Sequence, residues 1–170
     1  MVISKHSARK RAGFTLVEVV LAVGIAACTM IPVLGLIPTG LKTFRQAIDV
    51  SVGSQISQRV INESLQTDFA QLITDKGGAV IPPGKTGQKA YRYFDEQGNE
   101  VAKGAAVYQV NTRILTSTSL PGASYADLAT VTVQIANNPG DQPIAMNGAN
   151  LWQDSTFAIY ADSGLVARNQ

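Results

Sequence analysis

The stretch RKRAGFTLVEVVLAVGIAACTMIP, residues 9–32, decides the fold of this chain. From Val19 to Leu41 no residue is charged, and this run of 23 residues exceeds the roughly 20 that a helix needs to span a bilayer. The basic tract before it favours a cytoplasmic N-terminus, with the C-terminal part outside. Glu18 does not fit a plain anchor, because an acid at the centre of a membrane helix costs about 2.5–3.5 kcal/mol.

The charge balance depends on whether the basic tract is kept. The formal net charge is +2, but residues 14–170 carry 10 basic and 12 acidic side chains. That part has no basic patch, so no nucleic-acid partner is expected. The single Cys28 excludes an internal disulfide, and loss of the tract with the single His6 would exclude histidine-based catalytic and zinc sites. We expect no catalytic residue, metal or cofactor.

The residues leave three interpretations of this segment open. A single-pass anchor explains the basic flank and the apolar run but not Glu18. A lipoprotein signal would use IAAC, residues 25–28, as its lipidation site. Against it, Glu18 interrupts the apolar core, and hydrophobicity continues beyond Cys28, which then is a small packing residue. The third interpretation is a processing site that gives Glu18 a function.

The stretch KRAGFTLVE, residues 10–18, resembles the cleavage site of type IV prepilins and pseudopilins. In that family a basic leader ends in glycine, and a phenylalanine and then a glutamate at the fifth mature position follow. The resemblance implies that a prepilin peptidase cuts between Gly13 and Phe14 and methylates the new amino group of Phe14. It also implies four partners: other pilin or pseudopilin subunits, the peptidase, an inner-membrane assembly platform and membrane lipid.

The resemblance also implies a role for Glu18 in assembly and register. Cleavage would leave a positive amino group on Phe14, and Glu18 lies about 6 Å further along the helix axis. In filaments of this family the acid of one subunit is thought to pair with the terminal amine of a neighbour, and pairing offsets the cost of burying each charge. The simpler alternative is a tolerated acid at the membrane interface.

We expect an α+β, pilin-like fold in four segments. They are a cleaved leader at 1–13, the transmembrane half of a long helix at 14–40, its amphipathic half at 41–76, and an antiparallel β head at 77–170.

Three residues should disturb the membrane half of the helix. Pro32, Gly35 and Pro38 predict a kink, or the place where the helix melts on assembly, as family members have nearby. Beyond them, apolar residues at steps of three and four from Leu41 to Leu72 predict one buried face. The pattern indicates a helix that continues to about Thr74.

The remaining chain predicts strands and a helix stop. Gly77 and Gly78 should end the helix. The segment YRYFDEQGNEVA, residues 91–102, predicts strand, tight turn and strand, with Gly98 in the left-handed position. Further strands are expected at 106–117, 128–136 and 155–162. Four or five strands would form a sheet folded over the helical stripe, with Trp152 and Tyr160 as packing aromatics.

Two loops contain patterns that also occur in ligand sites. The segment AVIPPGKT, residues 79–86, matches a permissive phosphate-loop pattern, but a helix precedes it, a strand follows it, and two prolines remove N–H donors. We interpret it as a coincidence and Lys85 as a solvated lysine. The loop NNPGDQP, residues 137–143, could offer Asp141 to calcium, but its spacing matches no defined calcium loop and a turn between strands is the simpler explanation.

Three short stretches resemble a subgroup of pilin-like proteins. They are YFDEQG at 93–98, TGL at 39–41 and QTDF at 66–69, and they resemble the Verru_Chthon cassette protein B group. We expect a non-enzymatic subunit of a type IV pilus-like or pseudopilus filament, held in the bacterial inner membrane. The alternative is a single-pass inner-membrane protein whose outward-facing head binds a ligand and never polymerises.

Overall fold

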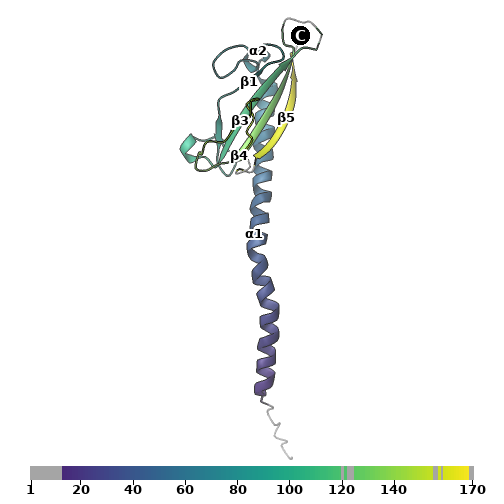
Figure 1. Cartoon of the computed structure of the whole chain (residues 1–170), viewed down its shortest axis with the longest axis vertical. Coiled ribbons are helices and arrows are strands. Elements are labelled where there is room, and N and C mark those ends of the chain that lie inside the picture. Colours follow the sequence, from purple (N-terminus) through teal and green to yellow (C-terminus); the bar gives the residue numbers. More distant parts are fainter. Residues whose placement is uncertain (1–12, 120, 122–124, 155–156, 158, 169–170) are drawn as a thin grey trace, which may run out of the picture. The chain divides into compact units, whose positions relative to one another are not determined.

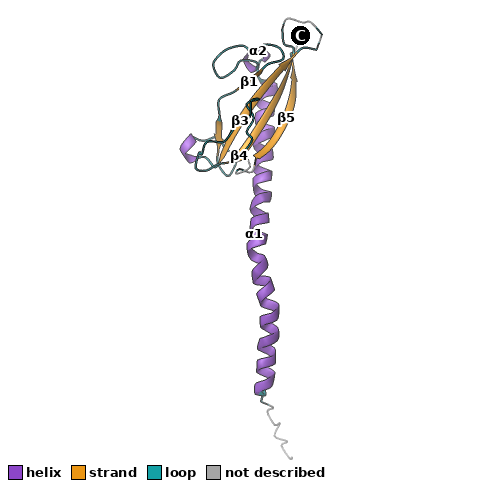
Figure 2. Cartoon of the chain, in the orientation of Figure 1, coloured by secondary structure: helices purple, strands orange, loops and turns teal. Residues whose placement is uncertain are grey.

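The computed structural model describes residues 13–119, 121, 125–154, 157 and 159–168. The chain divides into two compact units, residues 1–45 and 46–170. A long helix, α1 (Leu16–Gln66), begins in the first unit and ends in the second. The second unit adds an antiparallel sheet of five strands (Figures 1 and 2). The expected α+β, pilin-like fold is therefore confirmed.

The described part of the first unit is almost entirely helix. Every residue of α1 up to Arg45 is exposed, including its leucines, valines and isoleucines. Its most apolar 18-residue window has a mean hydropathy of 2.5, and none of that window is buried. Among the described residues, α1 is the one helix that is long and apolar enough to cross a membrane.

The sheet has the strand order β1-β3-β4-β5, and β2 also pairs with β3. The strands are β1 (Thr86–Gln88), β2 (Arg92–Phe94), β3 (Tyr108–Ser117), β4 (Leu128–Asn137) and β5 (Ile159–Ala167). Two short helices are α2 (Phe69–Leu72) and the 3-10 turn η1 (Lys103–Ala105). The strands β3 and β4 pair along their whole length, which makes them the centre of the sheet (Figure 1).

One face of the sheet packs on α1 within the second unit. Every fourth residue of the helix meets every second residue of β5, in the pairs Gly53 with Tyr160, Ser57 with Asp162, and Ile61 with Gly164. The Ser57 Oγ donates to Asp162 Oδ2 at 2.9 Å. Around these pairs the buried core includes Ile56, Val60, Phe94, Val110, Ile114, Val131, Val133 and Ile135. Side chains four residues apart on a helix and two residues apart on a strand each lie on one face, so these contacts place the core between α1 and this face of the sheet.

The opposite face of the sheet carries amides instead of a second apolar core. Gln109, Asn111 and Gln134 alternate with core residues along β3 and β4 and are nevertheless buried. The segment 138–154 covers them: Gln134 Oε1 accepts from Trp152 N at 2.6 Å, and Asn111 Nδ2 donates to Asn150 O at 3.0 Å. Because the Asn111 and Gln134 side chains are paired with this segment, they tie it to the sheet at low cost.

The helix is shorter than the sequence pattern predicted. It ends at Gln66, not near Thr74, and Gly77 and Gly78 lie beyond it in a separate turn. Asp68 has extended backbone (ψ 134°), and its carboxylate accepts from Ala70 N at 2.8 Å to cap α2. This break lets Phe69 and Leu72 turn into the core, where both are buried. The regular spacing of apolar residues that predicted one helix therefore combines residues of two helices, α1 and α2.

The buried helical stripe is also shorter than predicted. Val52 is half-buried and Ile56, Val60 and Ile61 are buried, whereas Leu65 is 51% exposed. The earlier members of the stripe, Leu41, Phe44 and Ile48, are 58%, 66% and 43% exposed. The sheet therefore covers about three turns of the stripe and leaves its N-terminal part free.

The strands agree with the sequence pattern in the middle of the sheet and differ at its margins. The predictions at 106–117 and 128–136 are confirmed by β3 and β4. The predicted strand at 155–162 lies later, as β5, and residues 155, 156 and 158 lie outside the described residues. The second arm of the 91–102 hairpin is reduced to one bridge, Phe94 to Glu100. The alternation of apolar and polar residues in the sequence did not predict the three-residue strand β1.

Candidate functional site

The predicted cleavage bond lies just before the helix. Gly13, Phe14 and Thr15 are not helical, and α1 begins at Leu16. The side chain of Phe14 is 88% exposed, and among the described residues no atom beyond Gly13 and its chain neighbours lies within 4 Å of where a Gly13 side chain would begin. The bond between Gly13 and Phe14 is thus open in this structure. Cleavage and methylation there stay predictions.

Thr15 and Glu18 form a capping box at the start of α1. Glu18 Oε2 accepts from the backbone N of Thr15 at 2.8 Å and from Thr15 Oγ1 at 2.9 Å. In return, Thr15 Oγ1 accepts from the backbone N of Glu18 at 3.3 Å. These bonds satisfy two of the N–H groups that a helix leaves unpaired at its first turn. Within one chain, Glu18 therefore stabilises the beginning of the helix.

The three predicted helix-disturbing residues lie within unbroken helix. Pro32, Gly35 and Pro38 are all interior to α1, which Figure 2 draws as one continuous helix. Each proline lacks the N–H that would bond four residues back, so the carbonyls of Cys28 and Leu34 lose their usual helical partners. A kink or local melting at these positions stays a prediction.

In the second unit, Asp49 joins α1 to two strands. Its Oδ1 accepts from Tyr108 Oη at 2.7 Å and from Asn137 Nδ2 at 3.1 Å. Burial, and then the hydrogen bond to Asp49, raises the pKa of the Tyr108 phenol, which therefore stays protonated and donates over the physiological range. The helix is held at the paired ends of β3 and β4 by these bonds.

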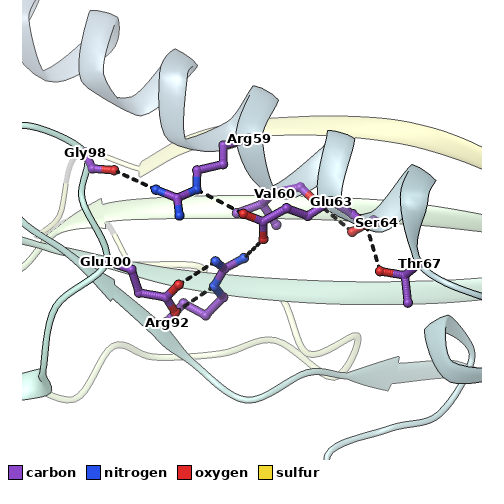
Figure 3. Close-up of polar contacts among 8 residues, drawn as sticks. All are labelled: Arg59, Val60, Glu63, Ser64, Thr67, Arg92, Gly98 and Glu100. Atoms are coloured by element: carbon purple, nitrogen blue, oxygen red, sulfur yellow. Dashed lines mark hydrogen bonds and ion pairs between the residues drawn. The ribbon is translucent and has the colours of Figure 1, made fainter.

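A charged network fixes α1 to the turn after β2 (Figure 3). Arg92 contacts Glu100 through two nitrogens, at 2.9 and 2.6 Å, and Glu63 Oε2 through a third, at 2.5 Å. Arg59 donates to Glu63 Oε1 at 2.9 Å and to Gly98 O at 3.4 Å. The Arg92 hydrogen bonds hold the pKa of Glu63 and of Glu100 below their usual values.

The turn held by this network has the predicted form. Gly98 has a φ of 77°, the left-handed conformation that favours glycine. Asp95 Oδ1 accepts from the backbone N of Gln97 at 2.9 Å and of Asn99 at 2.8 Å. The acidic residue thus organises the turn, and no ligand is needed to explain its presence in the sequence.

The phosphate-loop pattern has the geometry of an ordinary connection. Lys85 is exposed, and β1 begins at the next residue, where a phosphate-binding loop would begin a helix. The backbone N of Gly84 and of Lys85 donate to Thr116 O at 2.8 Å and Pro82 O at 3.1 Å. Those N–H groups are therefore engaged within the fold.

The loop at 137–143 is likewise closed by internal contacts. Lys103 Nζ lies 2.6 Å from Asp141 Oδ2, and Asn138 Nδ2 donates to Gln142 O at 2.9 Å. Within the described part of the chain, no three histidine, cysteine or acidic side chains are grouped as a metal site would need. The backbone N of Asp141 and of Gln142 also donate to Asn138, as in an ordinary turn.

Two groups of residues were not singled out from the sequence. Thr15 was missed, although T-x-x-E before an apolar run is a capping-box pattern. The buried amides Gln109, Asn111 and Gln134 were missed because polar residues at alternate strand positions ordinarily face solvent. What buries them is the segment 138–154, which carries no regular pattern.

An apolar helix with a capped start and a head of antiparallel strands on its C-terminal part define a pilin-like protein with one candidate membrane span. Residues 8–34 match the family model described as the prokaryotic N-terminal methylation motif. This match at the N-terminus supports a type IV prepilin-like protein. No curated protein and no solved structure gives a significant match.

The matched segment contains Gly13, Phe14 and Glu18 and most of the uncharged run. Together with the long apolar helix, it fits an inner-membrane anchor. The match stops at residue 34, before the three stretches that suggested the cassette group. That subgroup stays a prediction.

Proposed function

We propose that this chain is a structural subunit of a type IV pilus-like or pseudopilus filament. In this proposal a prepilin peptidase cuts after Gly13 and methylates Phe14, and the subunit waits in the inner membrane with its head outside. An assembly platform then adds it to a filament of related subunits. The methylation motif at residues 8–34, with Glu18 at the start of an exposed apolar helix, carries the proposal.

The exposure of the helix supports assembly through this segment. Residues 19–41 carry no charge and are all exposed, so apolar side chains lie on every side of this part of the helix, which in water would be strongly unfavourable. Lipid can cover this surface before assembly, and the helices of neighbouring subunits can cover it afterwards. The same surface therefore serves as anchor and as packing interface.

Before assembly, the capping box provides hydrogen-bond donors for the Glu18 carboxylate. In the single chain, Thr15 supplies its hydrogen bonds. One carboxylate oxygen, Oε2, accepts both of these bonds, so Oε1 is not used by Thr15. In a filament, the terminal amine of a neighbouring subunit would bind this acid, and the charge pair would offset the cost of removing it from water.

The family motif indicates a pilin-like structural protein, a class that is typically non-enzymatic. We therefore propose no enzymatic function. The alternative is a single-pass membrane protein with an outward-facing binding head that does not polymerise. Both proposals have the same membrane anchor and the same fold. In the alternative, Glu18 has no partner on a neighbouring subunit.

The deciding experiment combines processing with incorporation. The protein purified from its own membranes should begin at N-methylated Phe14, as determined by mass and N-terminal sequencing. Three variants are then compared by their amounts in the membrane and in sheared filaments. Glu18→Ala removes both the charge and the side-chain acceptor of the cap. Glu18→Gln removes the charge but keeps an oxygen acceptor for the cap. Thr15→Ala removes the hydroxyl group of the cap but keeps the charge of Glu18.

All three variants should remain in the membrane. We expect both Glu18 variants to be lost from filaments and Thr15→Ala to be incorporated. Normal incorporation of Glu18→Gln would show that the cap, not the charge, matters. An uncut N-terminus, or a wild-type protein absent from every filament fraction, would favour the non-polymerising anchor.

A further inference from the structure

The outer face of the sheet contains a groove that the filament proposal does not use. Its walls are Tyr91 and Tyr93 before and on β2, Gln109 on β3, Trp152, and the pair Lys103 and Asp141. Its volume is about 330 Å³, within the range of small-ligand sites. All of these residues lie on the sheet face opposite α1 or in the segments beside it. The groove is therefore separate from the helical assembly surface of the chain.

The floor of the groove holds an amide group with an unused donor. Gln109 is only 8% exposed, and its Oε1 accepts from Asn138 Nδ2 at 2.9 Å. Its Nε2 has no hydrogen-bond partner among the described residues. This nitrogen is not one of the buried polar atoms without a partner, so solvent in the groove reaches it, and an acceptor group of a ligand can take the place of that water.

Aromatic rings form the side of the groove above this amide. Tyr93 is the cross-strand partner of Gln109 and is half-buried, and its phenol has no hydrogen-bond partner among the described residues. Next to it, Tyr91 stacks on Trp152 with centroids 5.8 Å apart and an interplanar angle of 26°. This stack holds Tyr91 in place, so ordering it on binding would cost little conformational entropy.

The charges of the groove disfavour an anionic ligand. Its one cation, Lys103, is neutralised by Asp141 at 2.6 Å. Residues 46–170 as a whole carry 11 acidic and 8 basic side chains. A nucleic acid would gain little from this surface, because phosphate contacts supply most of its affinity. The ligand that fits is neutral and rich in hydroxyl groups.

We infer that this groove binds a neutral carbohydrate. The apolar C–H face of a hexose ring would lie on Tyr93 or Tyr91, and its hydroxyl groups would accept from Gln109 Nε2 and bond the phenol of Tyr93 and the Lys103–Asp141 pair. Aromatic faces combined with a few fixed polar groups supply both contact area and orientation. The inference does not depend on filament assembly.

The chain allows a direct test, because Trp152 is its single tryptophan. The full-length protein, in a detergent without a sugar headgroup, is titrated with cellohexaose, chitohexaose and maltohexaose while Trp152 fluorescence is recorded. We expect a saturable change with at least one of the three. Calorimetry on the same samples provides a readout that does not depend on fluorescence.

Variants test whether the sugar binds in the groove. Tyr93→Ala and Lys103→Ala change the groove, and their matched controls are Tyr125→Ala and Lys85→Ala, which change exposed residues elsewhere. Circular dichroism and the melting temperature verify that each variant is folded. Tyr93→Ala should weaken binding about tenfold or more, as truncation of a central aromatic contact does. The controls should leave the dissociation constant within about twofold.

Three outcomes would overturn the inference. The first is no saturable response to any of the three sugars by folded wild-type protein. The second is equal weakening by groove and control variants. The third is binding of a thymidine oligonucleotide or a proline-rich peptide in place of sugar, which would assign the groove to another class of ligand.

Discussion

At the scale of single residues, charged side chains in this chain act through short hydrogen bonds to defined partners. Glu18 bonds Thr15 in the first turn of α1, and Asp95 bonds the backbone of its own turn. Arg92 contacts two acids, one on α1 and one beyond the β2 turn. In each case the acid has a structural function that can be measured apart from any role in assembly.

The Arg92 network predicts an acid dependence of stability. The pKa of Glu63 and of Glu100 are lowered in the folded state, chiefly by the hydrogen bonds from Arg92. Their contribution is therefore present above their unfolded values near 4.5 and is lost as the pH falls through the folded values. The free energy of unfolding should fall on acidification below that value.

Arg92→Met should remove most of the dependence of stability on acidic pH. We expect a loss of about 1 kcal/mol at neutral pH, since the acids are partly exposed, and a shallower decline in acid. Thermal unfolding followed by Trp152 fluorescence at several pH values measures both effects. Lys85→Met, at an exposed lysine, is the control and should keep the wild-type slope. An unchanged slope in Arg92→Met would contradict the assignment.

At the scale of elements, the contact between α1 and β5 depends on the absence of side chains at defined points. A Cβ added at Gly164 would lie 2.8 Å from Ile61 Cγ2, which is too close for unbonded carbons. Ile61 is itself only 8% exposed and has little room to move. The glycine permits the helix to lie this near the strand.

Gly164→Ala should therefore destabilise the protein by about 1–3 kcal/mol. Ile61→Ala removes the obstructing methyl group, so the double variant should cost less than the sum of the two single changes. Gly148→Ala is the matched control, because nothing lies within 4 Å of its added carbon. Additive effects of the two changes would show that this contact does not limit the packing.

At the scale of the whole molecule, the division into two units corresponds to two environments. The first unit, to residue 45, exposes an apolar helix suited to lipid or to other helices. The second, from residue 46, has a buried core and a partly polar surface. A single helix belongs to both because its sequence changes from uniformly apolar to amphipathic along its length.

This division predicts that residues 46–170 fold without the membrane part. The truncated chain keeps Ile56, Val60 and Ile61, which α1 contributes to the core. It should be soluble and unfold cooperatively, as judged by coincident circular dichroism and Trp152 transitions. A chain beginning at residue 67 lacks that helical face and should not show a cooperative transition. Aggregation of the longer fragment would mean that the first unit is needed for folding.

The local patterns of the sequence were sufficient for several parts of this protein. The uncharged run after a basic tract, with GFTLVE at its start, indicated the anchor and the prepilin-like class, because both depend on chemistry within one segment. Alternation along 106–117 and 128–136 predicted the central strands, since two buried neighbours enforce that period. Gly98 was placed in its turn by its conformational freedom alone.

Other features were decided only by the tertiary structure. The helix ends at Gln66 because Phe69 and Leu72 have a core to turn into, and that core exists only when the sheet is formed. The late position of β5 follows from its register with β4 and its contacts with α1. Likewise, Gln109 belongs to a groove because the distant segment 138–154 covers that face of the sheet. Each of these depends on contacts between residues far apart in the chain, whose free energies no local pattern records.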